Sequence, residues 1–246
     1  MDLENLSEKQ NLRENYDPVI DVIYSSAGGA KEKYDSVGFF YDKILQIFRI
    51  KPMLDAFYLS ELKKDEKTLV LGFGSGFLLE KIITATDPIH KVYGLDFSER
   101  MHILANRRLS KLNIQNKTKL KIGNVLDMPY KSDSFDVVFA VYVLDIMKIN
   151  DISRLLYQIK RVLKSDGRLI LVAMTKEGKG LTKIMRKLYE WLYQYWPTTF
   201  GYHASSRPIY VDEEIEKADF EIINSKLTYI FTFGFPLKVI VAKKTN

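Results

Sequence analysis

The sequence predicts an α/β fold, with a doubly wound, mostly parallel seven-stranded sheet and helices on both of its faces. Strand and helix patterns alternate from Thr68 to Met174, and two further strand patterns follow near the end. The strands are nearly continuous in apolar residues, as in Val137–Leu144, which is expected where helices cover both faces of a parallel sheet. A ligand is then expected at the carboxyl ends of these strands.

The elements follow in order along the chain. Residues 1–60 have helical spacing of apolar positions, broken at 25–30 by a Ser-Ser-Ala-Gly-Gly-Ala run and punctuated by Pro52. Five strands are expected at 68–71, 91–95, 118–122, 135–141 and 168–174, with helices at about 77–86, 98–112 and 151–164. A helix at about 180–196, a loop through Pro208, a helix at 211–218 and strands at 220–231 and 236–242 complete the prediction.

Composition limits the classes of protein to consider. A chain of 246 residues with 46% hydrophobic residues fits one domain with decorations. The net charge of +6 suits an anionic membrane surface or nucleic acid, but the interspersed charges favour an ordinary solvated surface. The absence of cysteine excludes disulfides and thiolate metal sites, and the three scattered histidines have no ligand spacing, so no metal is implied.

The polar, acidic start is unlike a signal peptide, and the longest apolar run is too short to cross a bilayer. We therefore expect a cytoplasmic protein, with peripheral membrane contact as an open alternative.

A glycine turn follows the first strand. The run from Thr68 to Phe77 reads Thr-Leu-Val-Leu-Gly-Phe-Gly-Ser-Gly-Phe, and a second strand ends in Asp96, 20 residues after Gly76. Glycines let the backbone turn sharply and let a ligand approach, and an acid at this offset is suited to ribose hydroxyls. A dinucleotide fingerprint would need a further glycine where Phe77 stands, so the pattern indicates a nucleoside cofactor of another kind.

This pattern resembles the class I S-adenosylmethionine-dependent methyltransferases, and the resemblance continues in register to Ile170. The further motifs are Val92–Met101, Lys121–Tyr130, Asp133–Ala140 and Ile159–Ile170. The Met-Pro-Tyr and Ser-Phe-Asp pieces are similar to the branch that methylates quinones and phospholipids. The resemblance implies a Rossmann-like methyltransferase fold with an antiparallel C-terminal strand, and S-adenosylmethionine as cofactor. We divide the chain into an N-terminal helical cap (1–60) and a methyltransferase domain (61–246) with a helical lid insertion (176–210).

The resemblance also assigns cofactor residues. Asp96 would bind the ribose hydroxyls, although it could instead cap the next helix. Phe97 would pack on adenine, and Asn124 and Val125 would face its edge, although Gly-Asn is also an ordinary turn pair. The glycine loop would pass under the methionine part of the cofactor. The predicted cofactor residues in and before this site are Gly72, Phe73, Gly74, Gly76, Asp96, Phe97, Asn124, Val125, Tyr34 and Tyr41.

Two positions depart from the family pattern. Val70 stands where an acid usually helps to orient the glycine loop and the cofactor's amino group, and Asn124 replaces the commoner aspartate. Tyr34 and Tyr41, in a segment similar to the family's cofactor lid, could supply replacement contacts; the alternative for both is packing within an amphipathic helix.

Methyl transfer is a direct displacement, so the protein mainly positions and desolvates the two reactants. Where the acceptor needs a general base, the candidates are Asp145, Tyr142 and His203; the alternatives are a helix cap and inert surface. The helix from Leu181 to Trp196 has one apolar face, which fits packing on the sheet, a lid over an apolar acceptor, or a helix at a lipid interface. Its Trp191, and Arg207 in the following loop, are candidate acceptor contacts, Arg207 as an anchor for an acidic head group or as a surface turn.

The sequence thus predicts transfer of a methyl group to a small apolar or lipid-linked acceptor, such as a quinone precursor or a phospholipid amine. Methylation of RNA or protein is an alternative suggested by the basic charge, but no Asn-Pro-Pro-Tyr type tetrapeptide follows the fourth strand. A module that binds the cofactor without catalysis, or binds nothing, is the alternative suggested by Val70 and Asn124.

Overall fold

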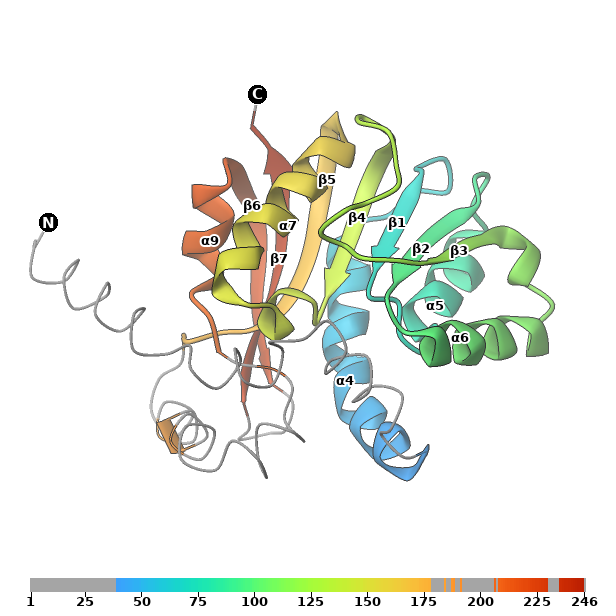
Figure 1. Ribbon diagram of the computed structural model, residues 1–246, viewed down its shortest axis with the longest axis horizontal. Coiled ribbons are helices and arrows are strands. Elements are labelled where there is room, and N and C mark those ends of the chain that lie inside the picture. Colours follow the sequence, from blue (N-terminus) through green and yellow to red (C-terminus); the bar gives the residue numbers. More distant parts are fainter. Residues whose placement is uncertain are drawn as a thin grey trace, which may run out of the picture.

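The computed structural model describes residues 39–177, 184, 187–188, 191, 206, 208–229 and 235–245. Their strands form one seven-stranded sheet in the order β3-β2-β1-β4-β5-β7-β6 (Figure 1). Strand β7 is antiparallel to both of its neighbours, β5 and β6, while the pairs among β1 to β5 are parallel. The strands are β1 (Thr68–Leu71), β2 (Val92–Asp96), β3 (Thr118–Ile122), β4 (Phe135–Val141), β5 (Leu163–Met174), β6 (Phe220–Tyr229) and β7 (Pro236–Lys244).

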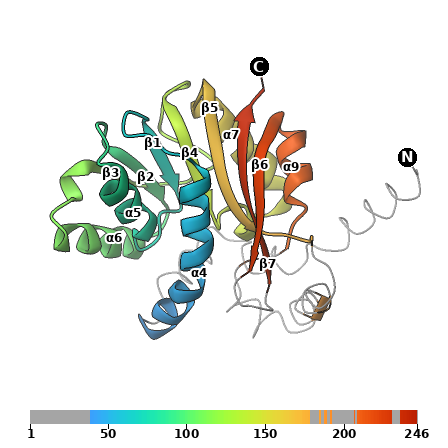
Figure 2. The ribbon, with the colours of Figure 1, turned by 180° about the vertical axis from the view of Figure 1, so that it is seen from behind.

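Helices cover both faces of this sheet. Helices α7 (Ile149–Val162) and α9 (Val211–Lys217) lie on one face (Figure 1), and α4 (Phe39–Leu59), α5 (Phe77–Thr86) and α6 (Glu99–Lys111) lie on the other (Figure 2). Short 3-10 helices, η1 (Gln115–Lys117) and η2 (Leu144–Ile146), precede β3 and follow β4. The two faces have separate cores, and Leu69 and Leu71 of β1 join the first while Val70 joins the second. The sheet is buried on both sides, so the predicted fold is confirmed.

The apolar patterns explain why these segments fold as they do. Helix α7 buries one stripe at helical spacing, and every residue of β4 except Asp136 is buried. Helix α6 begins after Ser98, whose hydroxyl accepts a hydrogen bond from the Met101 amide at 3.2 Å. The stripe on α7 consists of Ile152, Leu155, Leu156, Ile159 and Val162.

Two elements differ from the prediction. Strand β5 begins at Leu163, five residues before its predicted start, and α4 continues through Pro52 to Leu59. Proline in a helix interior removes one hydrogen bond and costs about 3 kcal/mol or more. Pro52 itself is buried, and the turn after it puts Ala56 and Phe57 into the core against α5, which offsets that cost. The predicted cap boundary near residue 60 and the lid at 176–210 stay predictions.

The end of α4 is fastened to the sheet by Arg168 of β5. Its guanidinium donates to the Ser60 carbonyl from Nε (2.9 Å) and Nη2 (2.7 Å), and to both carboxylate oxygens of Glu66 at 2.6 and 2.8 Å. Burial raises the pKa of Glu66, but the hydrogen bonds from Arg168 and from the Lys63 amide outweigh it and lower that pKa below its usual value. This matters for function because α4 supplies one wall of the site described below. Among the described helices, none has the length and apolarity to cross a bilayer.

Candidate functional site

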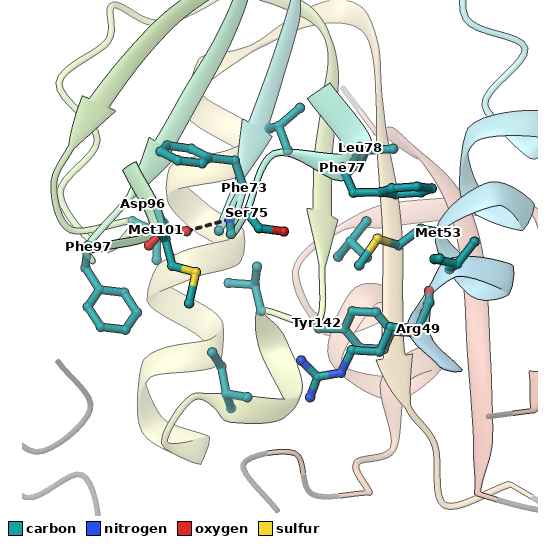
Figure 3. Close-up of a pocket in the computed structure, with 18 of the residues that line it drawn as sticks. Arg49, Met53, Phe73, Ser75, Phe77, Leu78, Asp96, Phe97, Met101 and Tyr142 are labelled. Atoms are coloured by element: carbon teal, nitrogen blue, oxygen red, sulfur yellow. Dashed lines mark hydrogen bonds between the residues drawn. The ribbon is translucent and has the colours of Figure 1, made fainter. Parts of the chain in front are cut away.

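A cavity of about 150 Å³ lies at the carboxyl ends of β1, β2 and β4 (Figure 3). Its walls come from the glycine loop (residues 72–76), the ends of β2 and β4, and the inner face of α4. Asp96 and Phe97 line one side, and Met53, Arg49 and Tyr142 line the other (Figure 3). The strand ends thus bring together residues that are far apart in the sequence, as expected for a doubly wound sheet.

The glycine loop needs its glycines for two different reasons. Gly76 has a φ of +84° and lies against α6, so a Cβ there would be 3.0 Å from the Cβ and 3.1 Å from the Cα of Ala105. Gly74 has a φ of +53°, but a Cβ there would meet nothing within 4 Å. Gly76 therefore allows the helices to pack closely, whereas Gly74 leaves backbone exposed beside open space where a ligand can approach.

Asp96 joins the end of β2 to the glycine loop. The residue is only 5% exposed, and its Oδ2 accepts from the Gly74 amide at 2.9 Å (Figure 3). Its Oδ1 accepts from the Ser98 amide, also at 2.9 Å. Burial raises the pKa of Asp96, and these backbone hydrogen bonds partly offset that rise. The cap of α6 is Ser98 rather than Asp96. Each carboxylate oxygen can accept two hydrogen bonds, so Asp96 retains capacity for ribose hydroxyls.

The predicted adenine residues separate into two groups. Phe97 and Val125 line the cavity. Asn124 is exposed and does not line it, and its Oδ1 accepts from the Leu126 amide at 2.9 Å. This is the geometry of an ordinary Asx turn, so the Asn124 side chain orders the loop after β3 instead of facing the cavity.

Two arginines that sequence reasoning missed hold the loops around this cavity. Arg108 of α6 donates to the Ser75 carbonyl at 3.1 Å and to Glu80 at 2.8 Å. Arg161 of α7 donates to the carbonyls of Tyr130 at 2.6 Å and Met128 at 3.0 Å, which fastens the loop after β3. Each arginine thus joins a helix to backbone carbonyls of a loop through charge-assisted hydrogen bonds. Arg161 lies within the motif Ile159–Ile170, whereas Arg108 is a basic residue in the last turn of α6 and belongs to none of the motifs.

Val70, where the family has an acid, is buried in the apolar core and lines the cavity. Its branched side chain cannot accept a hydrogen bond from the glycine loop. In this protein the loop is held instead by Asp96 on the Gly74 amide and by Arg108 on the Ser75 carbonyl.

Tyr142 closes the side of the cavity opposite Asp96. Its φ of +58° is unusual for a bulky residue, and its amide donates to the Val172 carbonyl at 2.8 Å. The ring lies 5.1 Å from the guanidinium carbon of Arg49, and the hydroxyl donates to the Arg49 carbonyl at 3.5 Å. Burial raises the pKa of the Tyr142 phenol well above its usual value, which disfavours the phenolate that a general base would need.

Asp145 lies in η2, behind this wall, and is fully buried without lining the cavity. Oδ2 accepts from the Met174 amide at 3.4 Å, Ser206 also hydrogen-bonds the carboxylate, and Oδ1 has no partner among the described residues. Burial raises the pKa of Asp145 to about 6, against the opposing effect of Arg49 and these hydrogen bonds. Such a carboxyl titrates in the range useful for proton transfer, but it does not reach the cavity.

Most of the remaining predicted site residues fall outside the part of the chain that the structure describes. Tyr34, His203 and Arg207 lie outside the described residues, as does the side chain of Tyr41 in α4. Trp191 is helical and 48% exposed. Arg49 was not predicted, and the sequence of α4 does not single it out, because Lys43 and Lys51 lie in the same helix. Within the described ranges, no cluster of three His, Cys, Asp or Glu residues could hold a metal ion.

Comparison with known proteins agrees with this geometry. Residues 69–171 match a family model described as a methyltransferase domain. Over this range the chain resembles a class I methyltransferase domain. S-adenosylmethionine is the cofactor of this domain, and the open space beside Gly74 with the spare acceptor positions of Asp96 fits an adenosyl group.

The most similar relatives show how far this comparison extends. The demethylmenaquinone methyltransferase of Lactobacillus johnsonii is 30% identical over 124 residues, which make up 50% of this chain and 50% of the relative. The chain thus spans about half the length of this curated relative.

Two solved structures support the fold. A structure from Methanosarcina mazei described as a SAM-dependent methyltransferase has a TM-score of 0.61 at 20% identity and covers 76% of this chain and 96% of its own. The [4+2]-cyclase SpnF also has a TM-score of 0.61, at 16% identity, and covers 78% of this chain and 81% of its own. The second neighbour is described by another chemistry, so the activity of this protein has to be argued from its site.

Proposed function

We propose that the protein transfers a methyl group from S-adenosylmethionine to a small, apolar acceptor of the quinone or lipid-linked type, by direct in-line displacement. The observation that carries this proposal is the two-sided cavity. Backbone amides of the glycine loop and the Asp96 carboxylate line one side, and apolar or aromatic side chains, Met53, Phe77 and Tyr142 among them, line the other. The similarity to a demethylmenaquinone methyltransferase supports an aromatic acceptor.

The residues of this chain would then bind, orient and exclude water. When bound, the cofactor supplies an electrophilic methyl group. Asp96 would accept hydrogen bonds from the ribose hydroxyls, and Phe97 and Val125 would contact the adenine. The open space beside the Gly74 backbone would leave room for the methionine part of the cofactor. The apolar wall would desolvate the acceptor and hold its nucleophilic atom in line, which is the main requirement of a displacement reaction.

An acceptor that must lose a proton requires a base. Tyr142 does not suit this role, because burial raises the pKa of its phenol and its hydroxyl already donates to the Arg49 carbonyl. Asp145, with a pKa of about 6, is better matched to proton transfer but would need a water or another side chain to relay the proton to the cavity. His203 in the late loop remains the other candidate, and Arg207 and Trp191 are proposed acceptor contacts.

Peripheral contact with a membrane, from the cytoplasm, fits a lipid-linked acceptor. Ile184, Leu188 and Trp191 are helical and exposed at 63%, 47% and 48%, with the spacing of one helix face, and Lys187 beside them is also exposed. Such a face with a basic flank favours a lipid interface or a lid over packing on the sheet. Sedimentation with anionic and with zwitterionic vesicles tests this, and equal recovery in the supernatant would exclude stable membrane binding.

The activity can be tested with methyl-labelled S-adenosylmethionine and three acceptors: reduced isoprenyl-naphthoquinone, phosphatidylethanolamine vesicles, and total RNA with protein extract. Label in the naphthoquinol supports the proposal, and label only in RNA or protein favours the alternative substrate class. Retention on RNA that falls with salt would support the same alternative.

Thermal unfolding with and without millimolar cofactor tests the non-catalytic reading. A cofactor that binds only the folded state raises the melting temperature by mass action. Gly74→Val is the negative control, because its side chain would enter the open space beside the loop. We expect this variant to lose both the cofactor-induced rise in melting temperature and the methyl transfer. No shift in the wild-type protein would contradict cofactor binding itself.

A further inference from the structure

Arg49 differs from three other arginines in the described part of the chain. Arg108, Arg161 and Arg168 each donate to backbone carbonyls and to a side-chain oxygen. Arg49 is half-buried and lines the cavity, and its guanidinium lies over the Tyr142 ring, but it has no acceptor oxygen among the described residues. A guanidinium has five N–H donors in a planar fork, so a half-buried one without acceptors retains its capacity for a ligand.

The surroundings hold this cation without using its donors. Tyr142 supplies a cation–π contact, and its hydroxyl bonds the Arg49 carbonyl instead of the guanidinium. The positive charge of Arg49 acts to lower the pKa of Asp145, although Oδ1 of that carboxylate has no hydrogen-bond partner among the described residues. The guanidinium lies beside Tyr142, on the side of the site away from Asp96 and Phe97 (Figure 3).

The charge of the proposed reactants makes this arrangement informative. The cofactor would bring a positive sulfonium into the cavity that already holds Arg49. Two positive charges in a partly desolvated site repel each other, and the repulsion grows as the effective dielectric constant falls. An anion between or beside them removes this cost and satisfies the donors of the guanidinium.

We propose that Arg49 forms an oxyanion subsite, in which its guanidinium binds a carboxylate or an ionised hydroxyl carried by one of the two reactants. The anion is either the methionine carboxylate of the cofactor or an ionised ring oxygen of the acceptor. This inference rests on the proposed function. Tyr142 is a positioning residue in it, since its ring holds the Arg49 guanidinium by a cation–π contact.

The first arm of the test asks whether the cofactor supplies the anion. Calorimetry on the full chain compares S-adenosylmethionine with decarboxylated S-adenosylmethionine, which keeps the sulfonium and the amine. If the cofactor carboxylate is the ligand, Arg49→Gln weakens S-adenosylmethionine binding by about tenfold or more and leaves the decarboxylated compound within about twofold. Arg49→Lys should recover part of the loss, because it keeps the charge without the fork.

The second arm asks whether the acceptor supplies the anion. With the chain saturated by S-adenosylhomocysteine, 2-hydroxy-1,4-naphthoquinone, an anion at neutral pH, is compared with uncharged 1,4-naphthoquinone. If the acceptor oxygen is the ligand, Arg49→Gln weakens the anionic probe by about tenfold and the neutral probe by less than about twofold. Lys51→Gln is the control in both arms, because Lys51 is an exposed cation of the same helix that does not line the cavity.

A charge-selective loss in either arm supports the subsite and identifies the reactant. Equal losses for charged and uncharged probes, or no loss in either arm, overturn it. Helical circular dichroism and the melting temperature of the variants show that α4 still folds, and the lysine variant serves if the glutamine variant does not. Failure of the wild-type chain to bind S-adenosylmethionine at all would instead overturn the proposed function, and the subsite with it.

Discussion

The two sides of the cavity differ in how their polar groups are held. On the Asp96 side, hydrogen bonds to the Gly74 and Ser98 amides fix the orientation of the carboxylate, and the loop conformation depends on glycines with positive φ. On the Tyr142 side, the backbone of a bulky residue is strained and a guanidinium has no acceptor among the described residues. The first side is preorganised for one fixed ligand. The second retains polar capacity, which suits reactants that arrive and change charge.

Removal of the Asp96 carboxylate should have the largest effect on cofactor binding. Asp96→Ala deletes the acceptor of the Gly74 and Ser98 amides and the proposed ribose partner. We expect S-adenosylhomocysteine to bind at least about 100-fold more weakly by calorimetry, because charge-assisted hydrogen bonds contribute about 1.5 to 3 kcal/mol each. Asp127→Ala, an exposed acid in the loop after β3, should stay within about twofold. If Asp96→Ala binds S-adenosylhomocysteine as tightly as the wild type, the cofactor does not bind at Asp96 and the glycine loop.

On the Tyr142 side, Asp145 should make the stability of the protein depend on pH. The pKa of Asp145 is raised from 3.8 to about 6, so the folded state binds a proton that the unfolded state releases. Its favourable contribution is complete below the unfolded pKa and is lost as pH rises through about 6, a change of up to about 3 kcal/mol. Urea unfolding between about pH 4 and pH 8 should show this decline in the wild type and a flatter profile in Asp145→Asn.

Asp136 supplies a control of opposite sign. Burial raises its pKa, but hydrogen bonds from the Lys164 side chain and the Lys67 amide outweigh this, so the pKa of Asp136 is lowered. Its contribution is present above the unfolded pKa and disappears as pH falls through the folded pKa. Asp136→Asn should therefore destabilise the protein at neutral pH and have less effect in acid. A matching slope in both variants would contradict the assignment of the decline to Asp145.

Within the glycine loop, stability and binding should separate. Gly76→Ala adds a methyl at a φ of +84° against Ala105, and we expect a loss of about 2 to 3 kcal/mol in the free energy of unfolding. Gly74→Ala has the same kind of strain but open space, so its loss should be near 1 kcal/mol while cofactor binding falls more. Denaturant unfolding and calorimetry on both variants check this, and equal stability losses would refute the packing role of Gly76.

The sequence allowed the fold to be predicted because its signals are local. Apolar runs such as β4, the helical stripe of α7 and the cap Ser98 each act within a few residues, and the structure confirms these elements. Helix α4 was harder to predict, since its passage through Pro52 depends on the burial of Ala56 and Phe57 by distant elements. Local propensity favours a break there, and tertiary packing overrides it.

The site divides in the same way. Gly74, Asp96, Phe97 and Val125 belong to motifs with fixed spacing, and the structure brings them to one cavity. Arg49 comes from α4, and its relation to the end of β4 depends on how that helix docks on the sheet. Asn124 shows the reverse, because its spacing fits a ligand role while its side chain closes a local turn. Spacing predicts position along the chain, but hydrogen-bond competition decides which way a polar side chain points.

The smallest effect should come from the tether behind the adenine side. Arg161→Lys keeps the charge but replaces a planar fork that spans the carbonyls of Tyr130 and Met128 with a single ammonium. We expect a loss of about 1 kcal/mol in stability, faster amide hydrogen exchange in the loop after β3, and a few-fold weaker cofactor binding. Arg154→Lys, in the same helix, is the matched control. Because the tether touches the cofactor side alone, binding of 2-hydroxy-1,4-naphthoquinone on the Tyr142 side should stay unchanged, and a parallel loss there would show that the two sides are coupled.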